Sequence, residues 1–147
     1  MRLKKAVSVT LMAVMSLTLL AGCGSDGQQG SKEGGSDGAV FKIGGIGPAT
    51  GSAAVYGEAV KNGAELAVKE INEAGGINGV QIEFNYQDDE NDAEKAVNAY
   101  NTLKDWDMQM LLGTVTSGPC VAVGEVAQED NMFMLTPSGT AVECVKY

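Results

Sequence analysis

The chain has 147 residues, a length that permits at most one domain. Its formal charge is −9 and it contains no histidine; without the first 22 residues, seven basic side chains face 19 acidic ones. This acidity argues against nucleic acid as a partner, because phosphates need Lys and Arg to neutralise them. The missing histidine excludes His-dependent catalytic triads and the commonest metal ligand.

Residues 1–22 are typical of an export signal. A basic head at residues 2–5 precedes an uncharged apolar run at residues 6–20, which is shorter than the about 20 residues of a membrane-spanning helix. The run ends in Leu-Ala-Gly-Cys, which resembles the bacterial lipobox. We therefore expect lipidation of Cys23 and anchoring on the extracytoplasmic face of a membrane. The alternatives are an ordinary signal peptide or an uncleaved anchor with an incidental cysteine.

Residues 23–39 are rich in Gly and Ser and offer almost nothing apolar to bury, so we expect a flexible tether. The folded part is expected to begin at Val40 and to include residues 40–147. There, strand-like runs alternate with helix-like runs. The expected strands are 40–46, 80–86, 107–112 and 132–135, and the expected helices are 53–74, 93–103 and 121–129. This order predicts an α/β fold with a parallel sheet and helices on both faces.

Two loops follow expected strands and are rich in hydroxyls and glycine, residues 113–120 and 136–140. Parallel sheets bind ligands at the carboxyl ends of their strands, and the start of a helix can hold a small anion. The two loops are therefore predicted to hold one small ligand, with the turn at residues 47–56 at the same end. The alternative is that such residues only cap helices and form turns.

The acidic run at residues 88–94 admits a calcium-loop interpretation. It lacks the glycine expected after the third ligand, where Ala93 stands, and Ala99 takes the place of the closing Glu. A solvated helix N-terminus, which favours negative charge, explains most of these carboxylates better.

The contrasting hypothesis is that the protein is an enzyme. A dinucleotide-binding unit could use the glycines at residues 45–47, but Thr50 replaces the third glycine and Pro48 occupies the helix start. Ser117 has no histidine to act as its base and no Gly-x-Ser-x-Gly setting. We therefore expect neither catalysis nor a cofactor.

Several segments, taken together in order, resemble a known family. They are residues 47–51, 56–57, 63–67, 70–72, 74–77, 88–89 and 136–138. The series resembles the substrate-binding lipoproteins of ABC importers for branched-chain amino acids, of the leucine/isoleucine/valine-binding type, which have the periplasmic-binding-protein type I fold. The resemblance covers residues 41 to about 145.

This resemblance implies a function and a set of ligand contacts. The protein would capture a branched-chain or similar amino acid and deliver it to a membrane permease. Ser117 and Thr140 would hold the ligand carboxylate through hydroxyl and backbone N–H. The carbonyl of Ser138 would meet the ammonium group, and Tyr56 would pack on the ligand side chain. The alternative within the same fold is an extracytoplasmic amino-acid or amide sensor, and neighbouring genes for permeases and ATPases would favour the importer.

Family members have two α/β lobes joined by a hinge. This chain reaches only the first part of the first lobe and stops just past the fourth expected strand. The sequence therefore predicts a truncated product or a fragment.

The cysteines depart from the family pattern. Some members close a disulfide at positions that here are Asn91 and Thr116, and this chain offers Cys120 and Cys144 instead. Both would lie near the strand ends, so an oxidised pair after export and two free buried thiols are both open interpretations.

Overall fold

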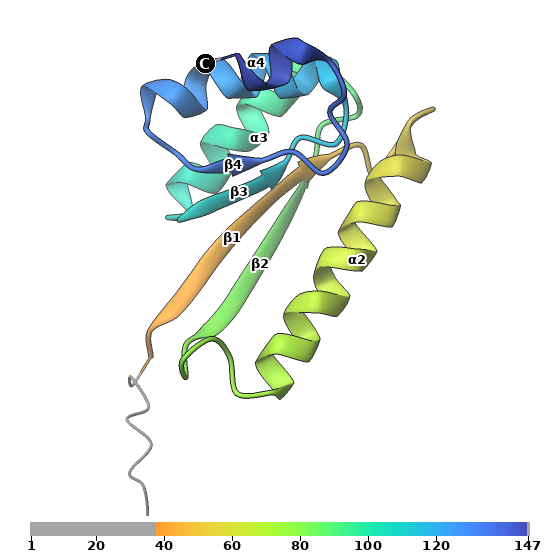
Figure 1. The fold of residues 1–147 in the computed structure, drawn as a ribbon. Coiled ribbons are helices and arrows are strands. Elements are labelled where there is room, and N and C mark those ends of the chain that lie inside the picture. Colours follow the sequence, from red (N-terminus) through yellow and green to blue (C-terminus); the bar gives the residue numbers. More distant parts are fainter. Residues whose placement is uncertain (1–37, 147) are drawn as a thin grey trace, which may run out of the picture. The chain divides into compact units, whose positions relative to one another are not determined.

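The computed structural model describes residues 38–146, which fall within one compact unit, Glu33–Tyr147. Strands and helices alternate along it (Figure 1). In chain order they are β1 (Val40–Gly47), α2 (Ala54–Glu73), β2 (Gln81–Asp88), α3 (Ala93–Asp105), β3 (Met110–Gly113), α4 (Ser117–Glu129), β4 (Met134–Leu135) and the 3₁₀ helix η1 (Val142–Val145). The expected signal, tether and lipidation site at Cys23 lie outside the described residues, apart from the last two tether residues.

The four strands form one parallel sheet in the order β2-β1-β3-β4. β1 pairs with β2 along its whole length, from Val40 opposite Gln81 to Gly47 opposite Asp88. On its other side β1 pairs with β3 from Ile43 to Ile46. The predicted parallel α/β architecture is confirmed, with the first strand in the interior of the sheet.

Helices cover both faces of this sheet, as the glycines of β1 demonstrate. A Cβ at Gly44 would meet Leu103 of α3, whereas a Cβ at Gly45 would meet Phe84 and Tyr86 on the opposite face. The Tyr86 hydroxyl donates a 3.2 Å hydrogen bond to the carbonyl of Gly57 in α2. Figure 1 accordingly shows α2 running along β1 and β2, with α3 and α4 packed together elsewhere on the sheet.

The main hydrophobic core lies between the sheet and the α3–α4 pair. Its fully buried members include Tyr100 and Leu103 of α3, Ile46 of β1 and Leu111 of β3. The buried Tyr100 ring places its hydroxyl on Asp130, to which it donates a 2.9 Å hydrogen bond. Burial and this carboxylate raise the pKa of Tyr100 above its usual range.

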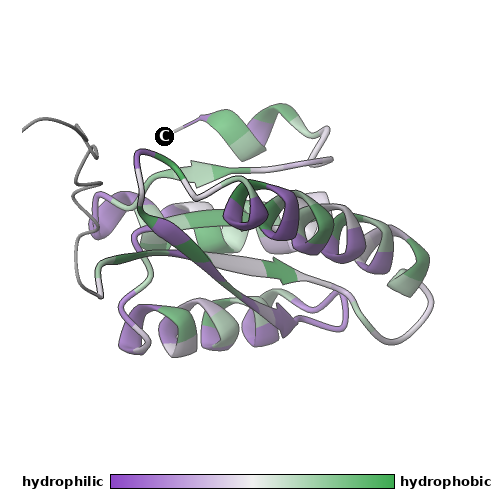
Figure 2. Ribbon diagram, turned by 90° about the horizontal axis from the view of Figure 1, so that it is seen from below, coloured by the Kyte–Doolittle hydropathy of each residue, from purple (hydrophilic) through white to green (hydrophobic). Residues whose placement is uncertain are grey.

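The α2 face is less well covered. Gly57 is the single buried residue of α2, and Leu66 on this helix is 56% exposed. The hydropathy colouring in Figure 2 shows hydrophobic and hydrophilic residues on different sides of the helices, and hydrophobic residues in the short helix beside the C-terminal end. There Val142 and Val145 of η1 are mainly exposed. None of the helices within residues 38–146 combines the length and the hydrophobicity of a membrane-spanning segment.

The largest difference from the expected elements is the start of α4. It begins at Ser117, four residues before the expected start at Val121. Pro119 does not prevent this, because a proline in the first turn of a helix lacks only an N–H that has no partner there. β3 and β4 are shorter than expected, beginning at Met110 and Met134. Ser117 therefore lies in a helical first turn and not in a loop.

Candidate ligand-binding site

All four strands end at one edge of the sheet because they are parallel. The loops that follow them, residues 48–53, 89–92, 114–116 and 136–141, therefore gather at that edge. The strand order changes direction at β1, since the chain goes from β1 to β2 on one side and then crosses to β3 on the other. Such a switch point is where open α/β sheets bind ligands, because the loops there diverge and leave a crevice.

The two hydroxyl-rich loops predicted to share a ligand lie against each other. Thr136, just after β4, donates from its hydroxyl to the carbonyl of Thr114 at 2.8 Å. The same hydroxyl accepts from the N–H of Gly139 at 2.9 Å, which folds the loop back on itself. The Ser138 hydroxyl donates to the carbonyl of Val115 at 2.6 Å. These bonds fix the loop after β4 on the loop after β3.

Ser117 links the same two segments from the first turn of α4. Its hydroxyl oxygen accepts from the N–H of Thr140 at 3.1 Å and from the N–H of Ala141 at 3.3 Å. The capping residue of α4 is Thr116, so the interpretation of Ser117 as only an N-cap is wrong. The Thr140 hydroxyl has no hydrogen-bond partner among residues 38–146. Ser117, Thr140 and an open helix N-terminus thus converge at one point.

Tyr56 is at the same edge but outside this network. It lies in the first turn of α2, and its side chain is 63% exposed. Its backbone N–H bonds only to Ala53, within its own turn. The structure therefore brings Ser117, Ser138 and Thr140 together, whereas Tyr56 lies apart from them, exposed beside the β1–α2 loop.

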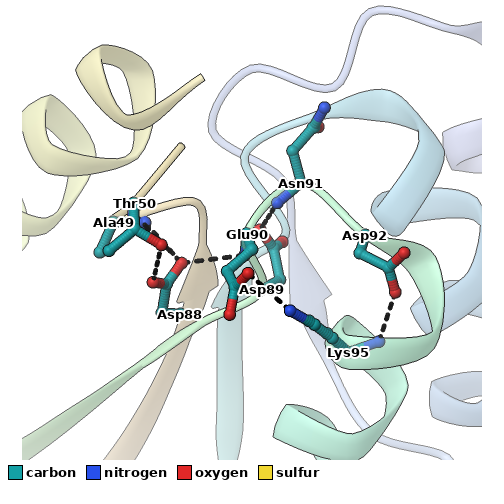
Figure 3. A network of polar contacts seen from close by, with 8 residues as sticks. All are labelled: Ala49, Thr50, Asp88, Asp89, Glu90, Asn91, Asp92 and Lys95. Atoms are coloured by element: carbon teal, nitrogen blue, oxygen red, sulfur yellow. Dashed lines mark hydrogen bonds and ion pairs between the residues drawn. The ribbon is translucent and has the colours of Figure 1, made fainter. Parts of the chain in front are cut away.

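Asp88, at the end of β2, holds that β1–α2 loop (Figure 3). One carboxylate oxygen accepts from the N–H of Ala49 at 2.8 Å and from the N–H of Glu90 at 2.9 Å, and the other accepts from the Thr50 hydroxyl at 2.6 Å. Burial would raise the pKa of Asp88, but the Thr50 hydroxyl and the backbone N–H groups outweigh it and hold the pKa below its usual range. Sequence patterns place Asp88 in the acidic run and in the family series, but they do not reveal that it positions this loop.

Asp89 is fully buried, which contradicts a solvated position for this member of the acidic run. One of its oxygens accepts from the N–H of Asn91 at 2.8 Å, and the other, Oδ2, is buried without a partner among the described residues. Burial raises the pKa of Asp89, the Asn91 N–H partly offsets this, and the charge of Asp88 adds to it. Figure 3 shows Asp88 at the end of β2 with its carboxylate directed toward Ala49 and Thr50.

Asp92 behaves as expected for a helix start. It is the N-cap of α3 and accepts from the N–H of Lys95 at 2.9 Å. Among residues 38–146, no group of three or more His, Cys, Asp or Glu side chains is arranged to hold a metal ion.

Comparisons with known proteins give this arrangement a family. A family model described as periplasmic binding protein matches residues 40–147. The chain belongs to the periplasmic binding protein family. Among curated relatives, the Leu/Ile/Val-binding protein BraC3 of Rhizobium johnstonii is 40% identical over 108 residues, which are 74% of this chain and 29% of that protein.

Two further comparisons agree with this membership. The "leucine-, isoleucine-, valine-, threonine-, and alanine-binding protein" of Pseudomonas aeruginosa is 36% identical, over 71% of this chain and 28% of its own length. The crystal structure of the branched-chain amino acid transporter substrate-binding protein LivJ of Streptococcus pneumoniae, in complex with isoleucine, matches with a TM-score of 0.69 and 35% identity. That match covers 73% of this chain and 31% of LivJ. This member of the periplasmic binding protein family thus spans less than a third of the length of each of these relatives.

Proposed function

We propose that the protein is the extracytoplasmic solute-binding component of an ABC importer. In this role it captures a branched-chain or similar amino acid and delivers it to a membrane permease. The observation that carries the proposal is the convergence of the Ser117 hydroxyl, the Thr140 N–H and the N-terminus of α4 at the switch point of the sheet. Its family membership and the names of its relatives point to the same class of ligand.

The chemistry of the site suits the carboxylate of a zwitterionic amino acid. Neutral hydroxyl and N–H donors at a helix N-terminus can hold a carboxylate by charge-assisted hydrogen bonds without a buried cation. Ser117 and Thr140 are the proposed donors, the carbonyl of Ser138 receives the ammonium group, and the exposed ring of Tyr56 packs on the side chain. No cofactor is needed for this role.

The proposal is one of binding and not of catalysis. The Ser117 hydroxyl oxygen accepts hydrogen bonds from two backbone N–H groups, and no side-chain base contacts it within the described residues. A serine nucleophile needs such a base to take its proton. The described residues can therefore hold a carboxylate but offer no activated nucleophile to attack it.

The proposed mechanism needs a second lobe, which the longer relatives have the length to supply. Closure of two lobes over the amino acid would expel water and strengthen the hydrogen bonds to its charged groups. The closed form would then dock on the permease. A lipid on Cys23 would keep the protein at the membrane surface, where the permease lies.

The test is isothermal titration of leucine, isoleucine and valine into the complete mature gene product. We expect saturable heat with at least one of the three and a 1:1 stoichiometry. Sucrose and inorganic phosphate serve as control titrants, since neither offers a carboxylate beside an ammonium group. An absence of heat with every aliphatic amino acid would overturn the proposal.

A further inference from the structure

Two cysteines lie directly behind the proposed carboxylate site. Cys120 is in the first turn of α4, three residues after Ser117, and Cys144 is in η1, four residues after Thr140. Their exposed fractions are 0% and 6%. Each is thus buried beneath one of the two segments that meet at the site.

The two thiols are neighbours across Gly139. A Cβ built on Gly139 would lie 3.3 Å from the sulfur of Cys120 and 3.1 Å from the sulfur of Cys144, so both sulfurs face one point. The Cys144 thiol also contacts the carbonyl of Ser117, at 3.8 Å. Both residues are free thiols in the structure. Sequence spacing could not establish this proximity, and the packing of α4 against η1 produces it.

Little else holds η1 in place. It packs against α4, while Val142 and Val145 are 62% and 74% exposed. A covalent bond between two buried residues would secure such a segment, because a cross-link limits the conformations of the unfolded chain and of a loosely packed end. Glycine at position 139 leaves room between the segments for the two sulfurs to approach.

We propose that Cys120 and Cys144 form a disulfide that joins α4 to η1 and thereby fixes Ser117 against the loop that carries Thr140. The second part of this statement rests on the proposed function. Residues 1–22 predict export, and disulfides persist in extracytoplasmic compartments. The bond differs in position from the one that the family resemblance placed at Asn91 and Thr116.

The oxidant is a disulfide of the thiol–disulfide exchange class, either a small molecule or a protein. The thiolate of one cysteine attacks it, which breaks the oxidant's S–S bond and gives a mixed disulfide. The thiolate of the second cysteine then attacks the bonded cysteine sulfur, which closes Cys120–Cys144 and releases the oxidant's remaining sulfur as a thiol, so that the oxidant ends as one dithiol or two separate thiols. The oxidant gains the two electrons, and the two thiol protons leave with its reduced thiol groups or with water.

The burial of Cys120 and Cys144 indicates at which stage the thiol–disulfide exchange occurs. Burial, and then the neighbouring Cys144 thiol, raises the pKa of Cys120 to about 11, so little thiolate is present in the folded chain at neutral pH. The bond therefore forms during folding, while both cysteines are accessible. Once closed, it is shielded from reductants.

The first experiment detects the bond in the complete mature protein purified from the exporting host. Free thiols are alkylated in denaturant without reductant, and the protein is digested with trypsin, which releases residues 105–146 as one peptide free of Cys23. A further digestion after Glu separates Cys120 from Cys144, because Glu125 and Glu129 lie between them. We expect two unalkylated fragments joined to each other. Full alkylation of both cysteines would overturn the proposal.

The second experiment tests the effect on the ligand site. Isoleucine affinity is measured for the oxidised protein and for protein that has been reduced in denaturant, refolded and kept in reductant. We expect about a tenfold weaker affinity after reduction, because a preorganised site binds at a lower entropic cost. Cys120→Ser and Cys144→Ser should start with the weaker affinity and show no response to reduction.

The possible outcomes distinguish the proposed disulfide from the proposed binding function. Joined fragments with unchanged isoleucine affinity after reduction would overturn the coupling between the bond and the site. No isoleucine binding in either redox state, with the fragments still joined, would contradict the proposed function and support the disulfide alone. The comparison of oxidised with reduced wild-type protein remains valid even where a serine variant fails to fold.

Discussion

The hydroxyl of Ser117 accepts a hydrogen bond from the backbone N–H of Thr140 at 3.1 Å, across 23 positions of the chain. This bond joins the first turn of α4 to the loop after β4. It brings a helix N-terminus, a side-chain hydroxyl and a backbone donor to one place at the carboxyl edge of the sheet.

Ser117→Ala and Thr140→Ala are each expected to weaken isoleucine binding by about 1 to 3 kcal/mol, because a charged carboxylate would lose a donor. Calorimetry on the complete mature protein measures this loss. Thr102→Ala is the matched control: Thr102 is exposed on α3, and its hydroxyl donates to its own helix at Asn98. Wild-type affinity in both site variants would mean that the carboxylate is held elsewhere.

Gly57→Ala and Gly63→Ala should change stability in opposite directions. A Cβ at Gly57 would lie 1.9 Å from the carbonyl oxygen of Pro48, so α2 must shift away from the β1–α2 loop, at a cost of about 1 to 3 kcal/mol. A Cβ at Gly63, on the same helix, meets nothing within 4 Å, and alanine there should stabilise by about 0.5 to 1 kcal/mol. Urea denaturation compares the two; equal effects would contradict the close contact at Gly57.

Asp88→Asn should loosen the β1–α2 loop in a pH-dependent way. The folded pKa of Asp88 is lowered, so its carboxylate stabilises the fold fully above the unfolded pKa of about 3.9. This contribution is lost as the pH falls through the lower folded value. We expect wild type to exceed the variant in unfolding free energy at pH 5 and the difference to shrink towards pH 2. Asp105→Asn, on the exposed side of α3, is the control. An equal pH dependence of the unfolding free energy in both variants would contradict a stabilising role for the Asp88 carboxylate.

Asp89→Asn should have the reverse effect. The folded pKa of Asp89 is raised, chiefly by burial, so its charged form opposes folding as the pH rises above about 3.9. Asparagine keeps an acceptor for the Asn91 N–H and removes the buried charge, which should stabilise the protein at pH 7 by roughly 1 kcal/mol. Thermal melts at pH 4 and pH 7 test this. A destabilised variant at pH 7 would show that the second carboxylate oxygen has a partner of its own.

Residues 24–147 alone should bind isoleucine at least about 100-fold more weakly than a complete two-lobed protein. The lobe would lack its opposing surface, and apolar residues such as Leu135, whose exposed fraction is 51%, would remain open to solvent. Calorimetry together with a thermal melt tests both effects. Tight binding by this segment, or a sharp cooperative melt, would contradict the prediction.

Much of the fold was accessible from sequence because the patterns are local. The helical spacing of apolar residues in α2 and α3 and the strand alternation around Ile82 located these elements to within a few residues. Sequence patterns predict the start of α4 four residues too late, because its first turn, Ser-Gly-Pro-Cys, has the composition of a loop. Pro119 is compatible with a helix start, which composition alone does not reveal.

The site was only partly accessible, since its contacts join distant positions. Ser117 could be nominated from its place after a strand, but its partners, Thr140 and Ala141, become visible only when β3 and β4 pair. Asp88 and Asp89 are adjacent in sequence and chemically alike. Asp88 accepts hydrogen bonds from the β1–α2 loop, whereas Asp89 is fully buried. The two side chains differ because successive residues at a strand end point to opposite sides.

Ser117 and Thr140 also have a kinetic consequence, because both lie on one side of the proposed cleft. Every amino acid carries the same carboxylate, so the first encounter with this edge does not depend on the side chain. Discrimination comes afterwards, when the cleft closes around that side chain. We therefore expect leucine, valine and alanine to associate at nearly equal rates and to differ in residence time, which stopped-flow measurements would resolve.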